Sequence, residues 1–141
     1  MTWQLLSGLA SAVLLAACGG ATGGGATGVR DAADDAAVHQ DIVSGRAGVE
    51  VTLDGTLTAD PVQVGTHEHL QVKTSAGDSL EIDHNTSLAP SVPAHAGDIV
   101  IVHGLLYIDP GPRAGVHCTH ARTSSGCPQP GYIELAGTYY E

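Results

Sequence analysis

Residues 97–108 read Gly-Asp-Ile-Val-Ile-Val-His-Gly-Leu-Leu-Tyr-Ile, and this stretch indicates the class of fold. The Gly-Asp pair opens a run of β-branched residues, which are among the side chains most favoured in strands. Up to Gly104, apolar residues fall on both faces of the expected strand. The stretch therefore predicts a strand over residues 99–108 in a β-rich domain.

Upstream of this strand, further segments alternate apolar and polar residues with a period of two. Residues 49–57 alternate around Gly55, which predicts a first strand with a bulge or bend at the glycine. Residues 67–75 and 79–85 flank the turn sequence Ala76-Gly77-Asp78, so we expect them to form a hairpin.

Five strands in this order, the last over residues 131–140, resemble an OB-fold. Closing them into a barrel would bury their Val, Leu and Ile faces and remove most free edges. Because residues 86–97 contain Pro90 and Pro93, we expect a loop where the OB-fold usually carries a helix. The predicted fold is mainly β, a small five-stranded OB-fold-like barrel with a short N-terminal helix.

The N-terminal part of the chain has the composition of an export signal followed by a tether. An apolar run ends in Leu15-Ala16-Ala17-Cys18, which resembles the lipobox of bacterial lipoproteins, where the cysteine is acylated after cleavage. We therefore expect a lipoprotein signal peptide over residues 1–17. Residues 18–30 form the expected flexible Gly/Ala/Thr tether, which starts at the lipidated Cys18.

The OB-like β domain is expected to cover residues 31–141. Residues 31–44 predict a short helix, because acidic residues lie early and Gly45 stands at its end. The anchor makes the membrane the expected partner and places the protein, exported, in the bacterial envelope. Gly19 after the cysteine favours the outer membrane, with the domain facing the periplasm.

Composition excludes one large class of partners. The chain has 141 residues, with 15 Asp and Glu against 5 Lys and Arg, and a formal net charge of −10. A groove that follows a phosphate backbone needs the opposite charge. Nucleic acid is therefore not an expected partner, and an acidic surface suits cations or simple solubility.

Three cysteines leave an odd thiol in an exported chain unless one is consumed elsewhere. Acylation of Cys18 resolves the count, so we expect Cys118 and Cys127 to form a disulfide in an oxidising compartment. One alternative makes Cys127 a thiolate ligand beside His117 and His120, and another leaves the thiols free.

The chain contains 8 histidines, an excess over its 5 basic residues, and several lie close together in the sequence. Imidazole is a common ligand of zinc and copper, and a carboxylate or water could complete such a site. Strand parity puts His84 on the core face of the hairpin and His67 with His69 on the opposite face, beside Glu81 and Asp83. Two sites, or one site and a buried structural His84, therefore stay open. The candidate metal ligands are His67, His69, His84, His117 and His120.

Several short motifs follow one another along residues 44–141. They are His67, His84-Asn85, Leu88-Ala89-Pro90, Gly97-Asp98, Gly104, Gly115-Val116-His117, Thr119-His120, and Gly131-Tyr132 through Gly137 to Tyr140. Together they resemble the bacterial domain-of-unknown-function family numbered 3465, an uncharacterised family that implies no activity. The resemblance singles out His67, His84, His117 and His120.

The chain departs from this family pattern at two positions. Cys118 stands where the family usually has Trp, and Cys127 stands where it usually has His. Because both departures introduce a cysteine, they favour a disulfide that replaces an aromatic packing contact. A change of ligand from His to Cys at position 127 would instead preserve a metal site.

Three functions follow from these features as hypotheses. The first is a periplasmic binding module with a His-lined site for a transition metal or a small polar ligand. The second is a metal-dependent hydrolase of phosphoester type that holds an activated water, although the usual hydrolase and nucleotide motifs do not occur in the sequence. The third is a structural or interaction protein of the cell envelope.

Overall fold

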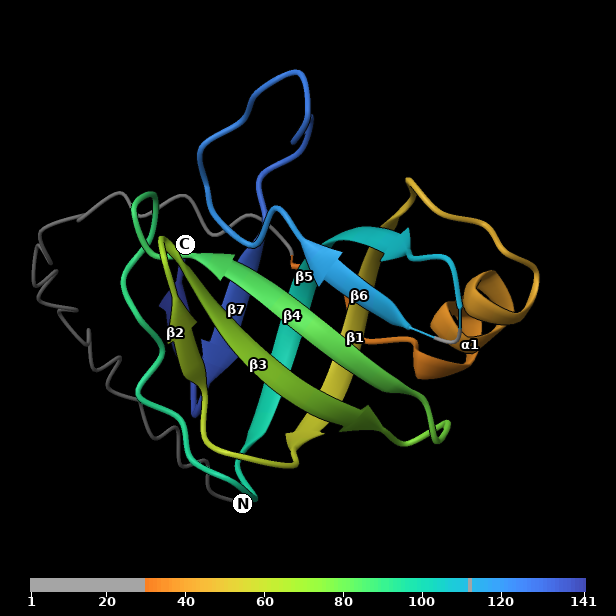
Figure 1. Cartoon of the computed structure of the whole chain (residues 1–141), viewed down its shortest axis with the longest axis horizontal. Coiled ribbons are helices and arrows are strands. Elements are labelled where there is room, and N and C mark those ends of the chain that lie inside the picture. Colours follow the sequence, from red (N-terminus) through yellow and green to blue (C-terminus); the bar gives the residue numbers. More distant parts are fainter. Residues whose placement is uncertain (1–29, 112) are drawn as a thin grey trace, which may run out of the picture.

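The computed structural model describes residues 30–111 and 113–141 (Figure 1). These residues form a mainly β domain with one short helix. The predicted signal peptide, Cys18 and the rest of the predicted tether up to residue 29 lie outside the described residues. In the part of the chain that is described, no helix has the length and apolar character needed to cross a membrane.

Five strands close into a barrel. They are β1 (Glu50–Leu57), β3 (His67–Thr74), β4 (Ser79–Asn85), β5 (Ile99–Ile108) and β6 (Ala114–His117). Around the barrel the order is β1-β3-β4-β6-β5, and β5 pairs with β1 to complete the circle. Neighbours are antiparallel except for β4 and β6, which run parallel. The closed barrel confirms the predicted OB-fold-like class.

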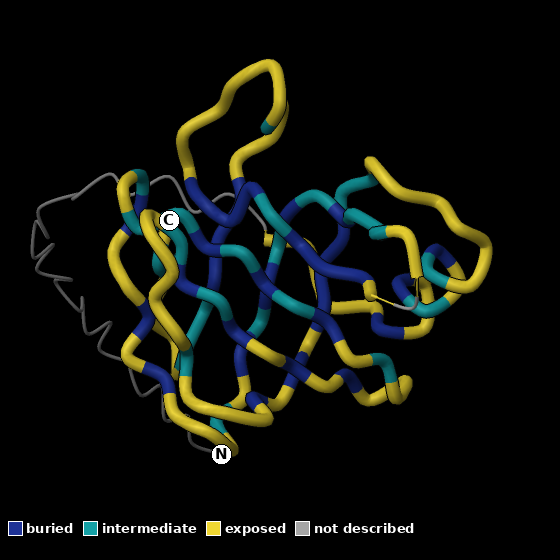
Figure 2. Tube along the Cα trace, viewed as in Figure 1, coloured by how far each residue is buried: buried dark blue, intermediate teal, exposed yellow. Residues whose placement is uncertain are grey.

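Aliphatic side chains that alternate along the strands fill the barrel. Figure 2 shows the corresponding buried positions along the chain. Leu53, Leu70, Ile82 and Val102 come from four different strands and are completely buried. Because successive residues of a strand point to opposite faces, the residues between these positions face outward. The outer faces of β3 and β4 are thereby left to polar side chains.

The fifth barrel strand is not the predicted one. It is β6, in a segment where the sequence predicted no strand, whereas residues 131–140 form a hairpin of β7 (Tyr132–Leu135) and β8 (Thr138–Tyr140). This hairpin pairs with β5 outside the closed circle and turns at Ala136 and Gly137, both with positive φ. β6 shows no apolar alternation, and pairing with β4 and β5 on its two sides makes it a strand.

The helix and connections largely follow the sequence prediction. Helix α1 (Asp35–Val43) is shorter than expected because Asp34 caps it, with its Oδ1 accepting the N–H of Ala37 at 3.0 Å. No helix forms in residues 86–98, as Pro90 and Pro93 predict. A short strand that the sequence did not indicate, β2 (Val62–Val64), pairs with the start of β3.

Candidate functional site

A histidine and two carboxylates meet on the outer face of β3 and β4. His69 and Asp83 are cross-strand partners, and Glu81 lies two residues before Asp83, so it shares their face. Nδ1 of His69 lies 2.9 Å from Oδ1 of Asp83 and 3.2 Å from Oε1 of Glu81. We call these three residues the His69 cluster. One ligand atom from each lies within 4.8 Å of the other two, an arrangement able to hold a cation.

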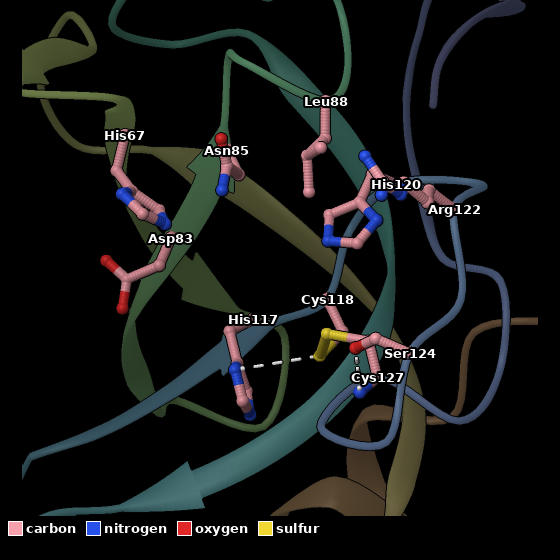
Figure 3. Close-up of a pocket in the computed structure, with 10 residues that line it drawn as sticks. All are labelled: His67, Asp83, Asn85, Leu88, His117, Cys118, His120, Arg122, Ser124 and Cys127. Atoms are coloured by element: carbon pink, nitrogen blue, oxygen red, sulfur yellow. Dashed lines mark hydrogen bonds between the residues drawn. A yellow bond between two sulfur atoms is a disulfide. The ribbon is translucent and has the colours of Figure 1, made fainter.

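A pocket of about 380 Å³ lies beside this cluster, where β4 and β6 end and residues 118–130 loop outward (Figure 3). His67, His117 and His120 all contribute to its wall. We call it the loop pocket. A more open depression of about 560 Å³ shares His67, Asp83 and His117 with it and extends to His69. The two hollows and the His69 cluster therefore form one continuous polar surface.

The histidines of the loop pocket differ in their surroundings. Burial lowers the pKa of His117 below its ordinary value, so its ring is mostly neutral at pH 7. His120 is only 6% exposed, and its Nδ1 is buried with no hydrogen-bond partner among the described residues. Buried polar atoms nearly always have a partner, so the unpaired Nδ1 of His120 indicates a place for a ligand, an ion or a water.

His84 lies apart from these residues, inside the barrel. Its ring is completely buried, with Nε2 2.9 Å from the carbonyl oxygen of Pro90 and Nδ1 2.8 Å from the hydroxyl of Thr119. A carbonyl can only accept, so Nε2 carries the proton and Nδ1 accepts from the threonine. Both ring nitrogens therefore form hydrogen bonds within the protein. This is what we expect if His84 is a buried structural residue.

The expected disulfide joins Cys118 to Cys127, across a Cα–Cα distance of 5.4 Å. It closes the base of the loop that covers one side of the pocket, beside the ring of His117 (Figure 3). With both sulfurs in the bridge, Cys127 is not a thiolate. In this bridged state Cys127 does not offer the thiolate that a site shared with His117 and His120 would need.

The five predicted ligands occupy three places rather than one. His69 belongs to the His69 cluster, His67, His117 and His120 surround the loop pocket, and His84 lies in the core. Within residues 30–111 and 113–141, two groups of three potential ligands fall within 4.8 Å: the His69 cluster, and His117 with the two bridged cysteines. Of these two groups, the His69 cluster is the one whose three potential ligand atoms include none in a disulfide.

Several polar residues of this surface were not among the predicted ligands. Glu81 and Asp83 complete the His69 cluster, and alternation along β4 had already put them on its face. Asn85 and Arg122 line the loop pocket. Asn85 belongs to the motif His84-Asn85 noted in the sequence, whereas no local pattern distinguishes Arg122. Their role depends on where the loop of residues 118–130 lies in space.

Comparison with known proteins gives no further assignment, because no family model matches the chain and no curated protein sequence matches it either.

Proposed function

We propose that this protein is an exported, lipid-anchored binding module whose barrel holds a divalent transition metal, zinc or copper, at the His69 cluster. The observation that supports it is the distance of Nδ1 of His69 from the oxygens of Asp83 and Glu81, 2.9 and 3.2 Å. Ligand atoms of one tetrahedral zinc ion, each about 2.0–2.1 Å from the metal, are separated by roughly 3.3 Å.

The chemistry of the cluster favours a transition metal over calcium or magnesium. Calcium and magnesium take oxygen ligands almost exclusively, whereas an imidazole nitrogen suits zinc, copper and nickel. Two carboxylates supply the negative charge that offsets the ion, and the chain's net charge of −10 attracts cations generally. The side chain of Glu81 is 37% exposed and that of His69 27%, so water can complete the shell from their side.

The location of the cluster also supports a binding role. It lies on the outer face of the second and third barrel strands, β3 and β4, the face through which OB-folds commonly bind their ligands. This support is an analogy at the level of the fold. The physical argument is that β3 and β4 pair over their whole length, which holds the three ligands in register.

Zinc titration of the chelator-stripped full chain, purified in mild detergent and followed by calorimetry, tests this proposal. We expect about one equivalent of zinc to bind, and His69→Gln to weaken binding by at least about tenfold. His95→Gln is the matched control, because His95 also lies near a carboxylate, that of Asp60 at 3.7 Å, but is strongly exposed in a loop. This control should leave zinc binding unchanged.

His69 can pair with the same two carboxylates without any metal, and the titration separates the two cases. A simple ion pair predicts no zinc binding beyond that of the His69→Gln variant. That result, or equal loss in the His95→Gln control, would overturn the proposal. Cleavage of a phosphodiester by the zinc-loaded chain, lost with His69→Gln, would assign the same residues to hydrolysis instead.

A further inference from the structure

We propose that the loop pocket binds a small organic carboxylate, independently of any metal at the His69 cluster. Its wall combines a set of hydrogen-bond donors with an apolar side formed by Leu88 and the disulfide. A carboxylate attached to a short hydrocarbon chain matches both halves of this wall. The four residues that supply the donors are Asn85, His120, Arg122 and Ser124.

Arg122 supplies the positive charge. The other three arginines lie within 4.0 Å of a carboxylate, Arg30 of Glu141, Arg46 of Asp41 and Arg113 of Asp109. Arg122 is exposed at the pocket and forms no ion pair with any described residue. In a strongly acidic protein, such an arginine is available to a carboxylate that comes from solution, and its planar group can bind it through two parallel hydrogen bonds.

Asn85 and Ser124 are available to the ligand as hydrogen-bond donors rather than as acceptors. Oδ1 of Asn85 already accepts from the backbone N–H of Ser87 at 3.0 Å and from its hydroxyl at 2.6 Å, so the amide NH₂ is left for a ligand. Oγ of Ser124 accepts from the backbone N–H of Cys127 at 3.1 Å, which leaves its own proton to donate. Both residues line the pocket (Figure 3).

His120 supplies the independent sign that something binds here. It is more than nine-tenths buried, its ring extends into the pocket, and its buried Nδ1 lacks a partner among the described residues. A nitrogen that carries a proton and faces a carboxylate satisfies this need with a strong, charge-assisted bond. No hydrogen bond between this ring and another described residue prevents Nδ1 from carrying that proton.

One carboxylate of the protein, that of Asp83, also lines the pocket and opposes an anion. Its Oδ1 lies 2.9 Å from Nδ1 of His69, and it stands on the β4 wall across the pocket from the loop that carries Arg122 (Figure 3). A monocarboxylate bound on the loop side avoids this charge. A dianion such as phosphate gains less, because it has no apolar part to set against Leu88 and the disulfide.

The volume of about 380 Å³ is at the lower end of the range for ligand pockets, which suits an acid of a few carbon atoms. The test is an NMR titration of the ¹⁵N-labelled full chain in detergent micelles, with EDTA present and ionic strength held constant. Sodium propionate, sodium succinate and inorganic phosphate serve as probes. We expect propionate to shift the amide signals of residues 118–127 in a saturable manner, and phosphate to bind more weakly.

Two variants and a control define the outcome. Arg122→Gln should weaken propionate binding about tenfold, and Ser124→Ala by a smaller factor. Arg113→Gln, which removes another exposed arginine that already pairs with Asp109, should leave propionate binding unchanged. The proposal is overturned by non-saturable shifts, by phosphate binding at least as tightly as propionate, or by equal effects of the two arginine variants.

EDTA makes this test independent of the metal proposal. Propionate binding in its presence supports the pocket whether or not zinc binds at the His69 cluster. Propionate binding that appears only after zinc is added would make the acid a ligand of the metal, and would overturn the assignment of the pocket.

Discussion

His84 shows at the scale of one residue how the partners of a side chain determine its role. His84 is one of the metal ligands predicted from the sequence. In the core, however, its two ring nitrogens form hydrogen bonds with Pro90 and Thr119. Strand parity predicted its inward direction correctly. Pro90 lies six residues along the chain from His84 and Thr119 lies 35 residues away, and no local pattern in the sequence indicates that either is its partner.

The burial of His84 predicts that acid destabilises the protein. Burial lowers the pKa of His84 below its usual 6.5. Between the lowered pKa and about 6.5, the unfolded chain binds more protons than the folded one, so stability rises with pH there. The contribution of His84 is complete above about pH 6.5 and is lost as pH falls toward the lowered pKa.

We expect His84→Gln to lower the free energy of unfolding by about 1–3 kcal/mol near neutral pH, because buried polar groups lose their partners. The variant should also lose less stability than the wild type between about pH 7.5 and about pH 5.5. Urea unfolding of the chelator-treated chain measures both. His95→Gln, at an exposed site, should keep the wild-type slope, and an unchanged slope in His84→Gln would count against the assignment.

At the scale of elements, the short strand β6 and the disulfide loop after it build the candidate pocket. β6 pairs with β4 and β5 through only a few residues, and the chain then leaves the barrel at His117. The disulfide between Cys118 and Cys127 holds the two ends of the loop together. Arg122 and Ser124 are carried between these ends, so the bridge determines where their side chains lie.

Reduction of this bridge should destabilise the domain and weaken ligand binding in the loop pocket. A loop with 9 residues of sequence separation gives about 2–3 kcal/mol of stabilisation by the chain-entropy account. We therefore expect a reductant to lower the melting temperature of the wild type, measured by circular dichroism. The Cys118→Ser/Cys127→Ser double variant should melt at the lower temperature with or without reductant, and an unchanged wild-type melt after full reduction would contradict this prediction.

At the scale of the whole molecule, barrel closure brings together residues that are far apart in the chain. β1 and β5 pair along seven positions, from Glu50 with Leu105 to Thr56 with Ile99, and this pairing completes the circle. The polar surface that holds both proposed sites then spans β3, β4 and β6 with the loop that follows β6. A barrel that is closed on all sides keeps this surface fixed.

The proposed anchor predicts where the whole chain resides in a bacterial cell. Cys18→Ser removes the thiol that would be acylated, and each buried CH₂ of an acyl chain contributes about 0.8 kcal/mol to membrane binding. We expect the wild type in the membrane fraction and the variant in the soluble periplasmic fraction, as judged by immunoblot. Cys127→Ser is the control for loss of a cysteine and should stay in the membrane fraction. Equal distribution of all three proteins would contradict the lipid anchor.

The sequence alone determined the features that depend on neighbours in the chain. Alternation predicted β1, β3 and β4, and a run of β-branched residues after Gly97-Asp98 predicted β5. Turn and proline residues predicted the hairpin and the loop before β5, and parity predicted the face shared by His69, Glu81 and Asp83. These succeed because a strand has a fixed period of two and burial of one face enforces it.

Tertiary structure alone decided which strand closes the barrel and which side chains share a site. β6 carries no periodic signal and exists as a strand because β4 and β5 supply hydrogen bonds on both of its sides. The distances among His67, His117, His120 and Arg122 likewise depend on the register and on the path of the loop. Such contacts join segments far apart in the chain, and their energies are realised only once the barrel has closed.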